Sequence, residues 1–182
     1  MWPLDNVFYD ASPYGRDGIN NGSVNAGGVI MDGQDFENAD KTDHIDVGKF
    51  NVSGNELTIS SWVNLELGAP GDGQIFAKAT GTQNPLHHYA FSTRKVGANY
   101  KLRFRIIAGG SLSVIQSAGG ITPSTWYYAS AVYDGSDMMV YINGVHSGSL
   151  SKSGDIIEED TVSPYIGNNP GSDVSPFDGI LE

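Results

Sequence analysis

The sequence predicts an all-β domain built as a two-sheet antiparallel β-sandwich. Its 182 residues contain 24 glycines and 8 prolines spread among many Asn, Asp and Ser residues, a composition typical of short strands joined by frequent turns. No stretch shows the 3.6-residue apolar period of an amphipathic helix. The hydrophobic content of 39% supports a packed core, and a chain of this length fits one undivided domain covering residues 1–182.

Short apolar or alternating runs bounded by turn residues predict the individual strands. They cover residues 57–64, 74–78, 88–92, 101–107, 113–116, 126–133, 138–143 and 164–166. Asp134-Gly135 and Asn143-Gly144 each follow one of these runs, and both dipeptides suit hairpin turns that need positive φ. The region 133–145 is therefore predicted to be a meander.

The alternation of side chains along these runs predicts which face of each strand is buried. In the run 101–107, the apolar side chains share one face, namely Leu102, Phe104 and Ile106. Arg103 and Arg105 share the other face, where they must be solvated, paired or used for binding. The run 138–143 alternates in the same way and carries Tyr141 on its outward face. A sandwich with a dry interior and an aromatic-bearing outer face follows.

Charge and composition exclude several classes of partner. The formal net charge of −11 and the pI of about 4.5 disfavour nucleic acid, whose phosphates an acidic protein repels. No apolar run reaches the length needed to insert into a membrane. The absence of cysteine excludes disulfides and thiolate catalysis, and it fits both surface modules and cytosolic proteins.

Many short pieces of the chain resemble, in the same order, the laminin-G-like jelly-roll modules of the concanavalin A-like lectin/glucanase superfamily, of the bacterial or phage type. They are Trp2-Pro3-Leu4-Asp5, Gly15-Arg16-Asp17-Gly18, Met31-Asp32-Gly33, His44-Ile45-Asp46-Val47, Leu57-Thr58-Ile59-Ser60-Ser61-Trp62-Val63, Trp126-Tyr127-Tyr128-Ala129, Tyr141-Ile142-Asn143-Gly144 and Phe177-Asp178-Gly179. The resemblance implies a jelly roll that acts as a non-catalytic carbohydrate-binding module of a larger secreted or cell-surface protein. Its partners would be a polysaccharide or glycan and other domains of the parent chain. A protein-interaction or structural adhesion module without a glycan site is the alternative.

The resemblance also bears on the end of the domain. Family members usually continue past the final Phe-x-Gly segment into another strand, whereas this sequence stops at Glu182. We therefore expect a fragment that lacks its final strand and leaves the neighbouring strand with an open edge.

An enzyme is not expected, although glycosidases and lyases share this sandwich. Retaining glycosidases need two carboxyl groups about 5 Å apart, which on a strand means acids at alternate positions. The nearest acidic run, Glu158-Glu159-Asp160, is contiguous and lies in a loop-like region.

A structural calcium ion is expected from the resemblance, because similar jelly rolls often hold one near their termini. The candidate ligands are Asp10, Asp17, Asp178 and Glu182, with turn capping as the alternative for Asp10 and Asp17. A second acidic group lies close together in the sequence and comprises Asp32, Asp35, Glu37, Asp40, Asp43 and Asp46. Its spacing does not match an EF-hand loop, so it is interpreted as a solvated insertion loop.

A sugar site needs aromatic rings to stack on pyranose C–H surfaces and planar polar groups to grip hydroxyls or carboxylates. The candidates are His87, His88, Tyr89, Arg94, Arg103, Arg105 and Tyr128. Basic groups gathered in an otherwise acidic protein would suit an acidic polysaccharide. The alternatives are that the arginines pair with acids on adjacent strands, that the histidines decorate a loop and that Tyr128 belongs to the core. Trp2, Trp62 and Trp126 are interpreted as core anchors.

Overall fold

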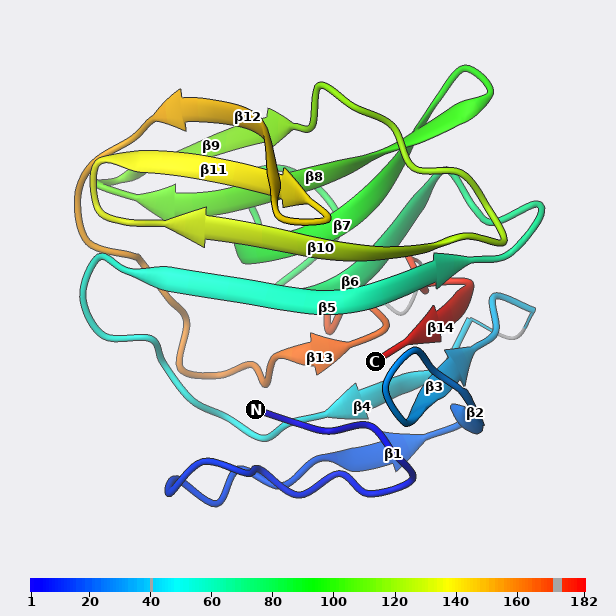
Figure 1. The fold of residues 1–182 in the computed structure, drawn as a ribbon. Coiled ribbons are helices and arrows are strands. Elements are labelled where there is room, and N and C mark those ends of the chain that lie inside the picture. Colours follow the sequence, from blue (N-terminus) through cyan, green and yellow to red (C-terminus); the bar gives the residue numbers. More distant parts are fainter. Residues whose placement is uncertain (40, 172–174) are drawn as a thin grey trace.

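Two seven-stranded antiparallel sheets stacked in two layers make up the computed structural model of the chain (Figure 1), which describes residues 1–39, 41–171 and 175–182. Sheet A has the order β1 (Ile19–Asn21), β4 (His44–Asp46), β13 (Tyr165–Ile166), β6 (Asp72–Ala79), β7 (His87–Val96), β8 (Asn99–Ala108) and β9 (Ser111–Gln116). Sheet B has the order β12 (Val145–Ser151), β11 (Asp137–Ile142), β10 (Trp126–Tyr133), β5 (Leu57–Leu65), β14 (Gly179–Leu181), β3 (Asp32–Phe36) and β2 (Val24–Gly27). The predicted two-sheet sandwich is confirmed.

The core lies between the two sheets, where the alternation predicted from the sequence places it. Leu102, Phe104 and Ile106 of β8 are completely buried, and Met138 and Val140 of β11 face them from sheet B. Burying side chains of this size stabilises the fold by about 1.5–3 kcal/mol each, so this interface supplies the main driving force for folding.

Both predicted hairpin turns are present. Asn143 and Gly144 have φ values of 52° and 76°, and this pair of positive angles lets β11 turn directly into β12. Gly135 has a φ of 85° between β10 and β11. The Asp134 carboxylate accepts hydrogen bonds from the backbone N–H groups of Ser136 and Asp137, which fixes that turn.

The acidic segment 32–46 is not a solvated loop, and that prediction was wrong. It contributes β3 and β4, and Phe36 and Ile45 of these strands are completely buried. The buried Asp43 carboxylate accepts the backbone N–H of Glu37 at 2.9 Å, so part of the acidity serves local structure. Asp40 lies outside the described residues.

Several short strands were not predicted from local sequence. β1, β2, β12 and β14 have sequences such as INN and VNAG, whose few apolar residues give no alternating signal. Their strand conformation depends on pairing with partners distant in the sequence. Among the described residues, no helix is long and apolar enough to cross a membrane.

Candidate functional site

The outer face of sheet B, turned away from sheet A, carries aromatic side chains on neighbouring strands. Alternation along each strand places the following residues on this face, and we call them the aromatic row: Trp62, Trp126, Tyr128, Tyr141 and His146. Tyr128 lies opposite Trp62 in the pairing of β10 with β5, and their ring centroids are 5.4 Å apart. The rings of Tyr141 and His146 make an edge contact at 5.6 Å. The row therefore spans four adjacent strands.

The aromatic row is accessible, and uncharged polar groups lie beside it. Tyr128 is 37% exposed and His146 is also exposed, while Trp62 is half-buried. Asn143 accepts the backbone N–H of Tyr128 through its Oδ1 atom at 2.8 Å, and the residue is exposed. An open sheet face with tilted rings and amide groups has the chemistry needed to stack on sugar rings and bind their hydroxyls.

Carboxylates gather at the end of the same outer face. Along one row of cross-strand pairs, Asn64 of β5 lies opposite Ile180 of β14, which lies opposite Asp35 of β3. Glu37 and Glu66 follow Asp35 and Asn64 by two residues each and so share their face. Oxygen atoms of Asp35, Glu37 and Glu66 lie within 4.8 Å of one another, and we call these residues the acidic cluster.

Burial and mutual repulsion between carboxylates raise the pKa values of two members of the acidic cluster. Burial raises the pKa of Asp35, and the charges of Glu37, Asp178 and Asp43 raise it further. Burial likewise raises the pKa of Glu66, together with the charges of Asp35 and Asp178. The buried Oδ1 atom of Asp35 has no hydrogen-bond partner in the described part of the chain. A divalent cation would relieve both the repulsion and the unpaired oxygen.

All four predicted calcium ligands accept hydrogen bonds from neighbouring groups. Burial raises the pKa of Asp10, but hydrogen bonds from the hydroxyl and backbone N–H of Ser12, from the Met1 ammonium and from Arg16 N–H outweigh it and hold that pKa well below its usual range. Asp17 accepts the backbone N–H of Asp10 at 2.8 Å. Both carboxylates therefore accept the hydrogen bonds expected of turn-capping residues, and their role as calcium ligands stays a prediction.

The other two predicted ligands lie near the end of β14. The Glu182 carboxylate accepts the backbone N–H groups of Val29, Ile30 and Met31, with distances of 3.0 Å from Oε1 to both Ile30 and Met31. Asp178 accepts the backbone N–H of Asn38 at 3.0 Å and raises the pKa values of two members of the acidic cluster. Asp178 therefore borders the acidic cluster.

Four of the predicted sugar-binding residues lie together on the outer face of sheet A: His87, Arg94, Arg103 and Arg105. We call them the basic cluster. Asp72 forms ion pairs with Arg94, at 3.2 Å, and with Arg103. Arg105 donates from Nη2 to Gln74 Oε1 at 3.0 Å. Arg103 and Arg105 are only 8% and 3% exposed, and the buried Nε atom of Arg105 has no hydrogen-bond partner in the described part of the chain.

Burial also changes the protonation of the basic cluster. Burial, together with the charge of Arg105, lowers the pKa of His87 to about 3. The Nη1 atom of Arg105 is 3.4 Å from His87 Nδ1. His87 is therefore neutral near pH 7 and can accept a hydrogen bond from that arginine. Burial lowers the pKa of Arg105 to about 9, with a contribution from Arg103.

The remaining three candidates lie elsewhere. Tyr89 is completely buried in the core, where its ring stacks on Phe76. The Nδ1 atom of His88 is 3.1 Å from the carbonyl oxygen of Ile157. Tyr128 belongs to the aromatic row on the other sheet. The structure thus brings four of the seven candidates together and separates the rest.

One of the three tryptophans packs against the core as predicted, and the other two do not. Trp2 packs against the core and stacks on Phe76 and Phe50. Trp62 and Trp126 were expected to be core anchors, but they lie on the outer face of sheet B. The alternation of β5 already contained this signal, because Ile59 and Val63 point inward and Trp62 has the opposite parity.

The family model of the concanavalin A-like lectin/glucanases superfamily matches residues 39–182. The chain belongs to this superfamily. The resemblance stated from the sequence motifs is therefore confirmed, and the superfamily's sandwich is the fold described above. No curated protein matches the chain in sequence.

Several solved structures have a similar fold over most of this chain. Domain 4 of AbnA, a GH43 extracellular arabinanase from Geobacillus stearothermophilus in complex with arabinotriose, is 19% identical with a TM-score of 0.67, covering 97% of this chain and 84% of that one. Mouse laminin α1 domains LG4-5 are 14% identical with a TM-score of 0.60, covering 82% and 39%. The Ruminococcus gnavus IT-sialidase CBM40 bound to α2,3-sialyllactose is 13% identical with a TM-score of 0.53, covering 90% and 88%. At these identities the likeness concerns the fold.

Proposed function

We propose that this chain is a non-catalytic carbohydrate-binding module of a secreted or cell-surface protein and that the glycan lies along the aromatic row. The observation that carries the proposal is the exposed Tyr128 ring beside the Trp62 ring on an open sheet face. Sugar rings stack on such aromatic faces, while Asn143 and Ser130 lie next to the row and can bind hydroxyls. Binding at one shallow site is weak, and tethering to a parent protein strengthens it.

Similar structures support this proposal. Two of the solved domains with this fold were captured with oligosaccharides, the arabinanase domain with arabinotriose and the sialidase module with sialyllactose. The fold is therefore able to present a sugar site. The choice of the outer face of sheet B as the glycan-binding face rests on the residues of this chain and not on the similar structures.

The charges favour an uncharged glycan over the acidic polysaccharide expected from the sequence. An acidic glycan would need free guanidinium groups, but Arg103 pairs with Asp72 and Arg105 binds Gln74, and both arginines are buried. Only Arg94 of the three arginines is well exposed. The polar neighbours of the aromatic row are amides and hydroxyls. These uncharged groups can form hydrogen bonds with the hydroxyl groups of neutral sugars.

Calcium at the acidic cluster is the second part of the proposal. Calcium prefers six to eight oxygen ligands, and carboxylates of Asp35, Glu37 and Glu66 with backbone oxygens and water can supply them. The unpaired Asp35 Oδ1 atom and the raised pKa values of Asp35 and Glu66 support this assignment. Bound there, the ion would tie β3 to the end of β5 across β14.

The test is a binding screen with neutral and acidic glycans, including arabino-oligosaccharides, sialylated oligosaccharides and polyuronates, run with calcium and with EDTA. We expect binding to a neutral glycan that Tyr128→Ala weakens and Arg94→Ala leaves unchanged. Selective binding of polyuronate, lost in Arg94→Ala, would move the site to the basic cluster.

Two further outcomes would overturn the proposal. Absence of binding by folded protein across the whole panel would favour an adhesion or protein-interaction module. Release of reducing sugar from the glycans, abolished by Glu66→Gln, would make the acidic cluster catalytic, since closely spaced carboxyls also suit glycoside hydrolysis.

A further inference from the structure

The aromatic row contains two pairs of rings on four adjacent strands. Trp62 of β5 lies opposite Tyr128 of β10, with ring centroids 5.4 Å apart, and we call these residues the inner pair. Tyr141 of β11 lies opposite His146 of β12, with ring centroids 5.6 Å apart, and we call them the edge pair, because β12 is the edge strand of sheet B. The two pairs can therefore contact successive parts of one extended ligand.

Two polar residues lie between the pairs. Tyr141 lies opposite Ser130, which follows Tyr128 by two residues on β10, so Tyr128 and Tyr141 are diagonal neighbours. The backbone N–H of Asn143 donates to the carbonyl oxygen of Tyr128 at 2.8 Å, which places Asn143 opposite Tyr128. Ser130 and Asn143 thus occupy the other diagonal of the same four positions. A chain that follows the aromatic diagonal runs between these two polar side chains, which can bind its hydroxyls on either side.

The rings within each pair are not parallel. The planes of the inner pair make an angle of 57°, and those of the edge pair make an angle of 76°. The hydroxyl of Tyr141 donates to the sulfur of Met139 at 3.2 Å, which holds that ring along β11. A flat crystalline surface can lie against only one ring of each pair. A single chain can follow both rings, because its successive sugars can turn relative to one another.

The span of the row sets the length of chain that it can hold. Neighbouring strands are about 4.8 Å apart, so the three steps from β5 to β12 cover about 14 Å across the sheet. The offset of two residues between Tyr128 and Tyr141 adds about 7 Å along the strands, which gives a diagonal of about 16 Å. One sugar lengthens an extended chain by roughly the separation of neighbouring strands, so the row spans about four sugars.

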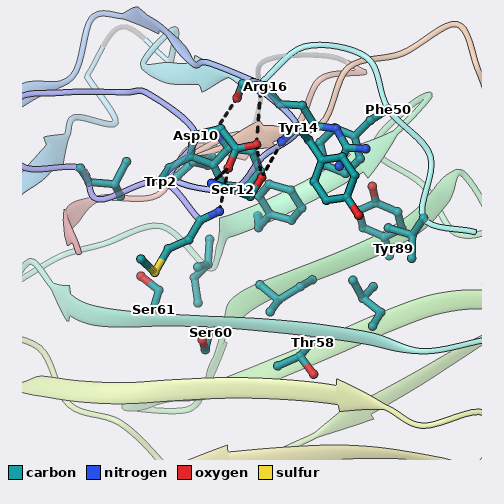
Figure 2. Close-up of a pocket in the computed structure, with 18 of the residues that line it drawn as sticks. Trp2, Asp10, Ser12, Tyr14, Arg16, Phe50, Thr58, Ser60, Ser61 and Tyr89 are labelled. Atoms are coloured by element: carbon teal, nitrogen blue, oxygen red, sulfur yellow. Dashed lines mark hydrogen bonds and ion pairs between the residues drawn. The ribbon is translucent and has the colours of Figure 1, made fainter.

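A cavity of about 520 Å³ between β5 and the N-terminal segment is a separate feature. Figure 2 shows Thr58 and Ser60 of β5 along one side of it, with Trp2 and Phe50 across from them. The ring of Trp2 stacks on the rings of Phe50 and Phe76, so these rings already contact one another. The described residues that line the cavity include no member of the aromatic row. The cavity therefore does not extend the glycan site.

We propose that the aromatic row binds an internal stretch of about four sugars from a single soluble polysaccharide chain, which crosses the strands from the inner pair to the edge pair. This inference rests on the function proposed above and specifies the class of glycan. Because the row ends on the edge strand β12, the chain can continue past His146, and the site requires no end of the polymer.

The test is titration calorimetry with arabino-, xylo- and cello-oligosaccharides, from the disaccharide to the hexasaccharide. In a series that binds, we expect affinity to rise about tenfold or more from the disaccharide to the tetrasaccharide, because the longer chain reaches both pairs, and to change less than about twofold from there to the hexasaccharide.

Variants of the edge pair test which rings the longer chain contacts. Tyr141→Ala and His146→Ala should each weaken tetrasaccharide binding about tenfold and disaccharide binding by at most about twofold. His146 is exposed, so its variant should keep the fold, which the thermal midpoint checks. The matched control is Tyr9→Ala, which removes a tyrosine that is 52% exposed in the N-terminal segment and should leave both affinities unchanged.

The outcomes separate this inference from the proposed function. Equal affinity for the disaccharide and the hexasaccharide, weakened by Tyr128→Ala but by neither edge-pair variant, would overturn the inference and leave a glycan site at Tyr128. Preferential binding to microcrystalline cellulose over soluble oligosaccharides would overturn it in favour of a flat surface. If the folded protein bound none of the three series, the inference would also fail, and the wider glycan screen described above would decide whether the proposed function survives.

Discussion

The ammonium group of Lys78 lies 2.7 Å from the Glu158 carboxylate, and both side chains are almost completely buried, at 0% and 4% exposed. Lys78 also donates to the carbonyl oxygen of Phe50 at 2.6 Å and to the side chain of Asn51. This ion pair joins β6 to the segment before β5 and to the segment after β12. Glu158 was interpreted from the sequence as part of a loop-like acidic run.

Removing one partner of this pair should destabilise the protein strongly. Glu158→Ala leaves the Lys78 charge buried with only neutral partners, so the free energy of unfolding should fall by about 3–5 kcal/mol. Denaturant unfolding followed by tryptophan fluorescence measures the change. Lys152→Ala, which removes an exposed contact with Ser111, is the control and should change stability by less than about 0.5 kcal/mol. An equal effect of both variants would contradict the importance of the buried pair.

His87 should make stability depend on pH below neutrality. Its pKa is about 3 in the folded protein and 6.5 for an unperturbed histidine, so the unfolded chain binds the proton more readily between these two pH values. The stabilisation that neutral His87 contributes to the folded state is therefore fully present above pH 6.5 and is lost as the pH falls toward 3. Between pH 7 and pH 5 the free energy of unfolding should drop by about 2 kcal/mol.

The matched histidine variants separate this effect from other titrations. His87→Gln should abolish most of the drop between pH 7 and pH 5, whereas His146→Gln, at an exposed site, should retain it. Denaturant unfolding at a series of pH values gives the slopes. If both variants kept the same slope as the original chain, His87 would not be the responsible group.

The aromatic row should account for most of the glycan affinity. Tyr128→Ala removes the most exposed tyrosine of the row and should weaken binding about tenfold, which corresponds to about 1.4 kcal/mol. Titration calorimetry with a glycan found in the screen measures this change. Tyr14→Ala removes a tyrosine that is 71% exposed but lies in the N-terminal segment, and it should leave affinity unchanged. Undiminished binding by Tyr128→Ala would place the sugar elsewhere.

Calcium should stabilise the chain through the acidic cluster. At a calcium concentration 100 times the dissociation constant, the free energy of unfolding should rise by about 2.7 kcal/mol relative to EDTA. Glu66→Gln should remove this difference, since it deletes one carboxylate of the cluster. Glu56→Gln changes the same charge at an exposed position and should preserve it. Thermal unfolding with and without calcium distinguishes the two variants.

Much of the fold could be predicted because burial within a strand is a local property. The alternation of residues 101–107 and 138–143 correctly predicted which side chains enter the core. The turns at Gly135 and Asn143-Gly144 were predicted for the same reason, since positive φ depends on the residue itself. The same rule, applied to β5, would have placed Trp62 on the outer face.

The candidate sites could not be predicted in the same way because they join strands that are distant in sequence. Asp35 and Glu66 come together only because β14 lies between β3 and β5. Arg103 and Arg105 were correctly placed on one face, but their partners Asp72 and Gln74 belong to β6, two strands away in sheet A. Sequence alternation gives the face of a side chain and no information about its neighbour across the sheet.

The sequence by itself determined the class of fold, the positions of the longer strands, the hairpin turns and the family, because each depends on local patterns of apolar and turn residues. Only the tertiary structure decided which polar groups are already occupied, as Arg103 is by Asp72, and which side chains are left exposed, as Tyr128 is in the aromatic row. The cavity that residues 58–61 of β5 help to line is likewise a tertiary feature, since its lining residues come from segments that are distant in the sequence. The physical reason is that strand order in a sheet is set by contacts between distant segments, whose sum no local pattern records.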